Sequence, residues 1–553
     1  MRQLSLLLVL SLAACDTPAI DDAGVLDTSI AATDAPVTDW PLMEVPASHT
    51  LEGGVVRDVL RLPTYQAPPN PTTGDVTPTE FNATQIARYH GGAPARAIVL
   101  AMPGFLGGAG SFDRLARELV AASIASGDPI EVWAIDRRAN LMEDLRGLDA
   151  AEASGNAEIA KGYYRGADTV GGERFGGYRV QESLGFMSEW GLATHVQDVR
   201  SLISRIPEAD RVEHVFLMGH SLGGTFAETF AAWRFEDGTR GADLLAGVIL
   251  IDGAQGEVPA EETAYLEGTS DGFMPSPGLE SIRTTTRFVE LPLLGVGVYT
   301  TAEILSLEAL TAPDAVVHDV ARNRTLGTLL GLPVGRVPDM TNEAALGWGF
   351  DSASNGLSFA AVSCGAAMGG PSEEYDGLLG GRLIHPSDPD ATYTWIDAPD
   401  ADPAEFTPIE SLAYSWTLGR TNFGEWYFPQ RLPIDLAAVG GLAVAEDGWQ
   451  ATLDLRAFDG ALMDAPVLAI AAGLRSVASF EASRARGAPL GADRPNAGTA
   501  RTDELAYRIV DATFMTHIDP LTAPHTDANP VPEAILAFIT ANVGAGTTSA
   551  NLD

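Results

Sequence analysis

The stretch RVEHVFLMGHSLGGTFAETFAAWRF, residues 211–235, decides how this chain is expected to fold. Its first part, Val212 to Met218, is rich in β-branched and large apolar residues and predicts a buried strand. The turn Gly219-His220-Ser221-Leu222-Gly223 follows, and a helix is predicted from there to about Trp233. A serine in a G-x-S-x-G turn between a strand and a helix is typical of a nucleophile elbow.

This context has chemical consequences for the serine. Changing from strand to helix within one residue forces Ser221 into a strained backbone conformation, and the flanking glycines let the two elements approach closely. The amide of Leu222 lies in the first turn of the helix, where unpaired N–H groups and the helix dipole favour a developing oxyanion. Ser221 is therefore a candidate nucleophile and Leu222 a candidate oxyanion donor.

A second match to the same pattern, Gly268 to Gly272, lacks this context. No apolar strand precedes it, and the residues that follow, Phe-Met-Pro-Ser-Pro, cannot open a helix cleanly. Only the Ser221 match is expected to be functional. A glycine-rich turn that merely packs well is the alternative reading of that match.

The first 46 residues predict export. Residues 1–14 combine Arg2, an apolar run and a small-residue cleavage site, as in a secretory signal peptide. The run Leu12-Ala13-Ala14-Cys15 resembles a bacterial lipobox, which would make Cys15 the lipid attachment site; an ordinary signal peptide is the alternative. Residues 15–46 lack any basic residue and predict an acidic, solvated tether. We therefore expect an exported protein that is lipid-anchored to a membrane of the bacterial cell envelope.

Composition limits the possible partners. The 553 residues are 46% hydrophobic, enough for a large core, and exceed the length of one ordinary domain. The net charge of −40, or −41 without residues 1–14, argues against nucleic-acid binding. Cys364 is the only cysteine besides Cys15, so no disulfide is expected within the mature chain.

The body of the chain alternates predicted strands and helices. Apolar strands are expected at 55–62, 83–89, 97–102, 130–135, 244–251, 466–471 and 506–510, and helices at 195–203, 477–486 and 532–543. This alternation predicts a mostly parallel sheet. The segment 140–191 is rich in glycine and charge and is expected to be an irregular surface excursion.

The alternation is lost between residues 255 and 460. The segment from Phe288 to Leu332 is too apolar for a solvated loop. We expect this block to be a cap over the carboxyl-terminal edge of the sheet that shapes an apolar acyl pocket. An independent second domain is the alternative for this block, and a stretch that simply forms the core of the insertion is the alternative for the apolar segment.

The chain resembles the α/β-hydrolase superfamily, in its serine esterase and lipase branch, over residues 95–254 and 465–545. The residues that carry the resemblance are the GFLGG loop, AIDRR, GHSLGG, ILIDGA and THIDP. The resemblance implies an α/β fold with a mostly parallel, doubly wound sheet. It assigns 47–254 and 461–545 to the hydrolase domain, makes 255–460 a cap inserted before the last two strands, and leaves 546–553 as a tail.

The resemblance also implies a catalytic triad in the chain order nucleophile, acid, histidine. His517, just after the last predicted strand, is the expected base, with His525 as the fallback. His220, inside the elbow, is expected to point away from the site and to have a structural role. The amide of Phe105, or else that of Leu106, is the second oxyanion candidate because it follows the strand 97–102.

The acid departs from the common pattern. The loop that usually carries it reads Gly473-Leu474-Arg475-Ser476 and has no carboxylate. Asp252, directly after the strand GVILI, is the preferred acid, as in some members of the superfamily. Glu481 and Asp493 are the alternatives.

These residues predict a serine hydrolase that cleaves small carboxylic esters without metal or cofactor. The sequence contains no HExxH, CxxC or P-loop motif. An amidase or peptidase with the same triad is one alternative. A catalytically inactive surface binding protein is another, which the missing acid after the strand 466–471 favours.

Overall fold

The computed structural model describes residues 47–552 except 93, 271–275, 378–380 and 402–404. The predicted signal peptide, Cys15 and the tether therefore lie outside the described residues. Among the residues described, no helix is long and apolar enough to cross a lipid bilayer.

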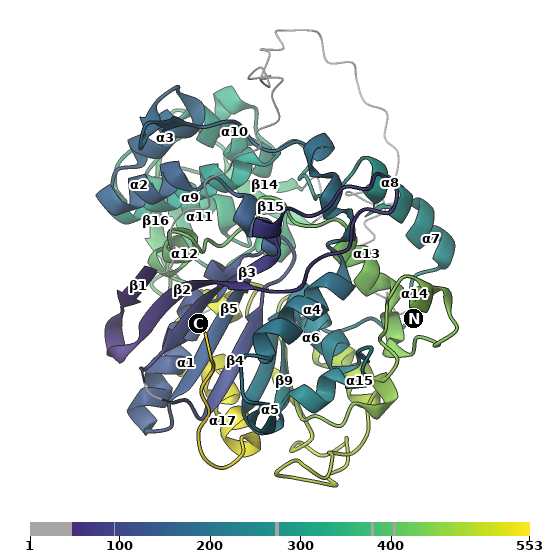
Figure 1. The fold of residues 1–553 in the computed structure, drawn as a ribbon. Coiled ribbons are helices and arrows are strands. Elements are labelled where there is room, and N and C mark those ends of the chain that lie inside the picture. Colours follow the sequence, from purple (N-terminus) through teal and green to yellow (C-terminus); the bar gives the residue numbers. More distant parts are fainter. Residues whose placement is uncertain (1–46, 93, 271–275, 378–380, 402–404, 553) are drawn as a thin grey trace.

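A nine-stranded sheet forms the centre of the molecule, in the order β1-β2-β3-β5-β4-β8-β9-β17-β18 (Figure 1). The strands are β1 Ala47–Thr50, β2 Val56–Pro63, β3 Ala83–His90, β4 Ala97–Met102, β5 Ile130–Asp136, β8 Val215–His220, β9 Gly247–Ile251, β17 Val467–Ala471 and β18 Tyr507–Asp511. Neighbours are parallel from β5 to β18, whereas β1, β2 and β3 pair antiparallel. The mostly parallel sheet, with a large insertion before its last two strands, confirms the expected α/β-hydrolase fold.

Both faces of the sheet are covered by helices. Along β4, Ile98 and Leu100 pack into a core with α4 (Leu192–Ile203) and α6 (Leu222–Ala231). The intervening Val99 packs with α1 (Asp113–Ser126) and α17 (Val531–Asn542) on the opposite face. Burial on both faces explains why these strands read as continuous apolar runs and not as alternating ones.

The strand before the elbow is shorter than predicted. Residues 212–214 belong to α5 (Glu208–His214), and β8 begins only at Val215. Pro207 precedes α5, and Glu208 and Asp210 lie in its first turn, where acidic side chains stabilise the amino end of a helix.

The expectation of an irregular excursion at 140–191 is wrong. This segment contains α2 (Arg146–Ser154) and α3 (Ala157–Arg165), and its aromatic residues Tyr163, Tyr164 and Trp190 are buried. They pack with residues of the insertion in a second hydrophobic core. The many glycines and charged residues of this segment mask its apolar residues, which are covered by distant parts of the chain, including the insertion.

The insertion between β9 and β17 is itself folded. Its helices are α7 Glu262–Glu267, α8 Leu279–Thr284, α9 Gly297–Thr311, α10 Val320–Leu329, α11 Asn342–Phe350, α12 Ile409–Trp416, α13 Arg431–Ala438 and α14 Trp449–Thr452. Its strands are β10 Gly268–Thr269, β11 Ser276–Pro277, β12 Asp339–Met340, β13 Gly365–Met368, β14 Ser372–Asp376, β15 Arg382–Pro386 and β16 Thr392–Asp397. Part of this insertion lies over the strand ends that carry Ser221 and the loop after β4. The residue boundaries of hydrolase domain and cap stay predictions.

Candidate active site

Ser221 occupies a strained turn between β8 and α6. Its φ of 55° and ψ of −122° lie outside the regions that residues with a side chain ordinarily adopt. The Ser221 amide donates to the carbonyl of Ile251 at 2.9 Å, which ties the turn to the end of β9. A Cβ at Gly219 would overlap the carbonyl of Gly223, so the close approach of strand and helix requires glycine there. These are the features of a nucleophile elbow.

His517 and Asp252 meet at the same edge of the sheet. Asp252 follows β9, and its Oδ2 lies 2.6 Å from Nδ1 of His517, which follows β18. Both side chains are buried: that of Asp252 is 0% exposed and that of His517 is 1% exposed. Burial opposes the charge on Asp252, but the hydrogen bonds from His517 and from the Leu474 amide hold the pKa of Asp252 below its ordinary value. Asp252 is thus an ionised acceptor that orients the imidazole.

The loop after β17 contributes no carboxylate of its own, but its backbone holds the carboxylate of Asp252 in place. Three of its backbone amides donate to the Asp252 carboxylate: Ala472 at 3.0 Å, Arg475 at 2.7 Å and Leu474 at 2.8 Å. Asp252 itself has a φ of 46°, a positive value that is uncommon outside glycine. The loop after β17 therefore supplies hydrogen-bond donors to an acid that follows the neighbouring strand β9.

His220 does not point away from the site as expected. Its Nε2 donates to the carbonyl oxygen of His517 at 2.8 Å, and the two rings lie 4.4 Å apart between centroids. Burial, and then the repulsion of His517, lower the pKa of His220 to about 3. His220 is therefore a neutral donor that supports the His517 loop.

Asp519 anchors that loop from the other side, a role the sequence did not reveal. It begins the short helix α16 (Asp519–Thr522) and is fully buried. Its carboxylate accepts hydrogen bonds from the amide and hydroxyl of Thr516, the amide and hydroxyl of Ser363, and the hydroxyl of Thr407. Since Ser363 and Thr407 belong to the insertion, Asp519 joins the His517 loop to it.

The other histidine and acids considered from the sequence lie elsewhere. His525, Glu481 and Asp493 are exposed on the surface. Glu481 pairs with Arg484 within α15 (Val477–Ala485). The structure therefore brings together Ser221, His517 and Asp252 and leaves the alternatives outside the site.

The loop after β4 presents candidate oxyanion donors. Among the described residues, the amides of Phe105 and Leu106 donate to no protein group. Leu106 has a φ of 59°, which shapes the turn. Leu222 begins α6, where backbone amides lack an intrahelical acceptor. Phe105, Leu106 and Ser221 all line one pocket.

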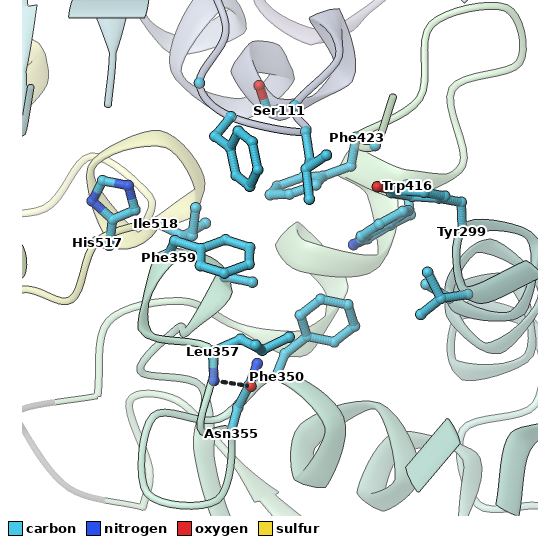
Figure 2. A pocket seen from close by; sticks show the side chains of 18 of the residues that line it. Ser111, Tyr299, Phe350, Asn355, Leu357, Phe359, Trp416, Phe423, His517 and Ile518 are labelled. Atoms are coloured by element: carbon cyan, nitrogen blue, oxygen red, sulfur yellow. Dashed lines mark hydrogen bonds between the residues drawn. The ribbon is translucent and has the colours of Figure 1, made fainter. Parts of the chain in front are cut away.

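That pocket is apolar and lies largely under the insertion (Figure 2). Ser221 and His517 both line this pocket. Figure 2 shows His517 and Phe359 on one side and Tyr299 on the other. The insertion contributes mainly apolar side chains: Leu291, Leu294, Val298, Leu329, Phe350, Leu357, Phe359, Trp416 and Phe423. As expected from the sequence, the segment 288–332 supplies part of this wall.

Comparison with known proteins gives distant structural likenesses. No family model matches the sequence, and no curated protein matches it significantly. A candidate lipase from Sulfolobus solfataricus is 12% identical, with a TM-score of 0.44 over 91% of this chain and 99% of that one. A thermophilic esterase from Thermogutta terrifontis is 11% identical, with a TM-score of 0.33 over 88% and 99% of the two chains. A soluble variant of monoglyceride lipase from Saccharomyces cerevisiae is 11% identical, with a TM-score of 0.29 over 93% and 100%. Likenesses of this extent identify neither a family nor an activity.

Proposed function

We propose that the protein is a serine hydrolase that cleaves carboxylic esters with an apolar acyl group. The observation that carries this proposal is the strained Ser221 in the same pocket as His517, whose Nδ1 is held by the Asp252 carboxylate. A serine hydroxyl is a weak nucleophile at its free pKa and needs a positioned base. The triad supplies that base with a fixed tautomer.

The reaction follows from these positions. Ser221 Oγ attacks the ester carbonyl carbon while its proton passes to Nε2 of His517, and the amides of Leu222 and Phe105 stabilise the oxyanion. The C–O bond to the alcohol then breaks as His517 returns the proton to the leaving oxygen. Water attacks the acyl-enzyme by the same steps and releases the carboxylic acid. Asp252 stays ionised throughout and stabilises the imidazolium.

The alternative of an inactive binding protein rested on the absence of an acid after β17. Asp252, oriented by three amides of that loop, removes this reason. Ester and amide cleavage share the triad, and the apolar pocket favours a substrate with an apolar acyl group.

Hydrolysis of p-nitrophenyl butyrate tests the proposal. The wild-type protein should release p-nitrophenol, and both Ser221→Ala and His517→Ala should lose about 10³-fold or more in kcat. His525→Ala, the exposed histidine eight positions later, is the matched control and should retain full activity. Ester hydrolysis that survives in Ser221→Ala would overturn the proposal, as would faster turnover of aminoacyl amides than of esters.

We also propose, from the sequence of residues 1–46 alone, that the protein is exported and anchored by a lipid on Cys15. Metabolic labelling with a fatty-acid analogue should mark the wild-type protein and not Cys15→Ser. Equal labelling of the two would contradict this proposal.

A further inference from the structure

A buried arginine holds the carbonyl side of the loop after β4. Arg137 follows β5, and its side chain is 1% exposed. Its guanidinium donates to the carbonyl oxygens of Pro103, Gly104 and Gly107, with the Gly104 and Gly107 bonds at 3.1 and 3.0 Å. Because one rigid guanidinium carries several N–H donors, it bonds to three carbonyl oxygens of the loop at once and holds the loop at three points.

The cation is itself held by the insertion. Glu425 is 0% exposed, and its Oε2 accepts from Nη1 of Arg137 at 2.7 Å. The amide of Glu425 donates to the carbonyl of Leu106 at 2.8 Å. The amide of Gly108 donates in turn to the carbonyl of Phe423 at 2.6 Å, so residues 423–425 run alongside the loop.

These contacts determine where one amide points. A trans peptide group is planar, and its C=O and N–H point in opposite directions. The bond from Arg137 to the Gly104 carbonyl therefore turns the Phe105 amide away from the arginine. The Phe105 amide has no protein acceptor in the described structure, and Phe105 lines the pocket that contains Ser221.

Resting on the proposed function, we infer that Arg137 and Glu425 are positioning residues for the oxyanion site, acting through the Gly104–Phe105 peptide. The insertion thus has a second role besides covering the pocket, since it supplies the carboxylate that fixes the cation. A rigid donor stabilises the transition-state oxyanion more than the ground-state carbonyl, so the effect falls on kcat and not on KM.

Arg138 provides a matched control because it is the next residue and its side chain is 0% exposed. Its guanidinium pairs with Asp198 and also donates to Asn82 and to the carbonyl of Tyr65. Within the described residues, Arg138 forms no hydrogen bond or ion pair with the loop 103–108. A lysine at either position keeps the charge and loses the planar fork.

The test compares Arg137→Lys, Glu425→Gln and Arg138→Lys with the wild type, using p-nitrophenyl butyrate and an alkyl trifluoromethyl ketone. Ser221 Oγ bonds to the ketone carbon while its proton passes to His517 and the carbonyl π electrons move to the oxygen, which gives a hemiketal oxyanion. The corresponding alcohol forms no oxyanion and reports ground-state binding. Arg137→Lys should lose about 10²-fold in kcat and in ketone affinity, with KM and alcohol affinity changed less than about twofold. Arg138→Lys should lower the melting temperature and leave kcat and ketone affinity intact.

If Arg137→Lys does not fold, the nearly isosteric Glu425→Gln variant tests the inference in its place. We expect it to lose about tenfold in kcat and in ketone affinity. An active wild type whose Arg137→Lys and Glu425→Gln variants keep its kcat would overturn this inference and leave the proposed function standing. Equal losses of ketone and alcohol affinity would also overturn it. A folded wild type without Ser221-dependent hydrolysis would overturn both.

Discussion

Nδ1 of His517 lies 2.6 Å from Oδ2 of Asp252, although the two residues are 265 positions apart in the chain. The whole insertion separates them in sequence. Because both follow parallel strands of one sheet, β9 and β18, they meet at its carboxyl-terminal edge. Ser221 is attached to the same edge through its bond to Ile251.

Asp252→Asn should lower kcat by about 10²- to 10⁴-fold, because an amide no longer holds His517 in the productive tautomer. It should also destabilise the fold by about 1–3 kcal/mol, since the new NH₂ group faces backbone donors that the carboxylate accepted. Stopped-flow or steady-state ester hydrolysis and thermal melting measure the two effects. An active Asp252→Asn together with an inactive Glu481→Gln would move the role of the acid to Glu481.

Asp519→Asn should weaken both the fold and the activity. The carboxylate accepts from five donors in the interior, and an amide replaces one acceptor oxygen by a donor. We expect a loss of about 3 kcal/mol in the free energy of unfolding and a lower kcat, because His517 lies two residues away. Asp511→Asn, on the exposed end of β18, is the control and should change neither. Unaltered melting of Asp519→Asn would show that the anchor is unimportant.

Asp351 makes stability depend on pH. Burial raises its pKa from 3.8 in the unfolded chain to about 7 in the folded protein. Between these values Asp351 binds more protons in the folded state than in the unfolded state, so its contribution to stability is largest below about 3.8 and is lost as pH rises to about 7. Asp351→Asn cannot ionise, so its melting temperature should decline less than that of the wild type between pH 5 and pH 8. Asp493→Asn, at an exposed position, is the control, and its melting temperature should vary with pH as that of the wild type does. A melting temperature of Asp351→Asn that varies with pH in the same way as the wild type would contradict the prediction.

The pocket predicts a preference for longer acyl chains. Each added methylene that is buried contributes up to about 0.8 kcal/mol, or about fourfold in kcat/KM, until the pocket is full. A series of p-nitrophenyl esters from acetyl to decanoyl measures this. Phe350→Ala removes a ring that lines the pocket and should shift the optimum to a longer chain, whereas the exposed Phe514→Ala should not. A flat series, or one that falls steadily from acetyl, would refute the acyl pocket and leave the triad untouched.

Local patterns in the sequence were sufficient for the elbow and for every strand of the central sheet except β1. The strand and helix on either side of Ser221 are contiguous in sequence, so their hydrophobic patterns and the glycines between them are visible together. The chain order implied by the resemblance to α/β-hydrolases then indicates Asp252 and His517, which the structure places in contact. Burial on both faces gave the central strands unbroken apolar runs that could be located to within a few residues.

The features that the sequence did not reveal depend on contacts between distant segments. The amides that hold Asp252 belong to the backbone and leave no trace in residue identity. Arg137 and Glu425 lie 288 positions apart, and each alone reads as an ordinary charged residue. The segment 140–191 has apolar residues that pack against distant parts of the chain, including the insertion, and this packing is not visible in the local sequence pattern.

The most direct test of the central claim is to identify the residue that reacts with an alkyl fluorophosphonate. The phosphorus forms a bond to the activated serine oxygen and fluoride leaves, and peptide mass spectrometry then locates the adduct. We predict one adduct per chain, on Ser221, with none in Ser221→Ala and slower labelling in Asp252→Asn. A folded wild-type protein that stays unlabelled, or an adduct on any other serine, would contradict the account.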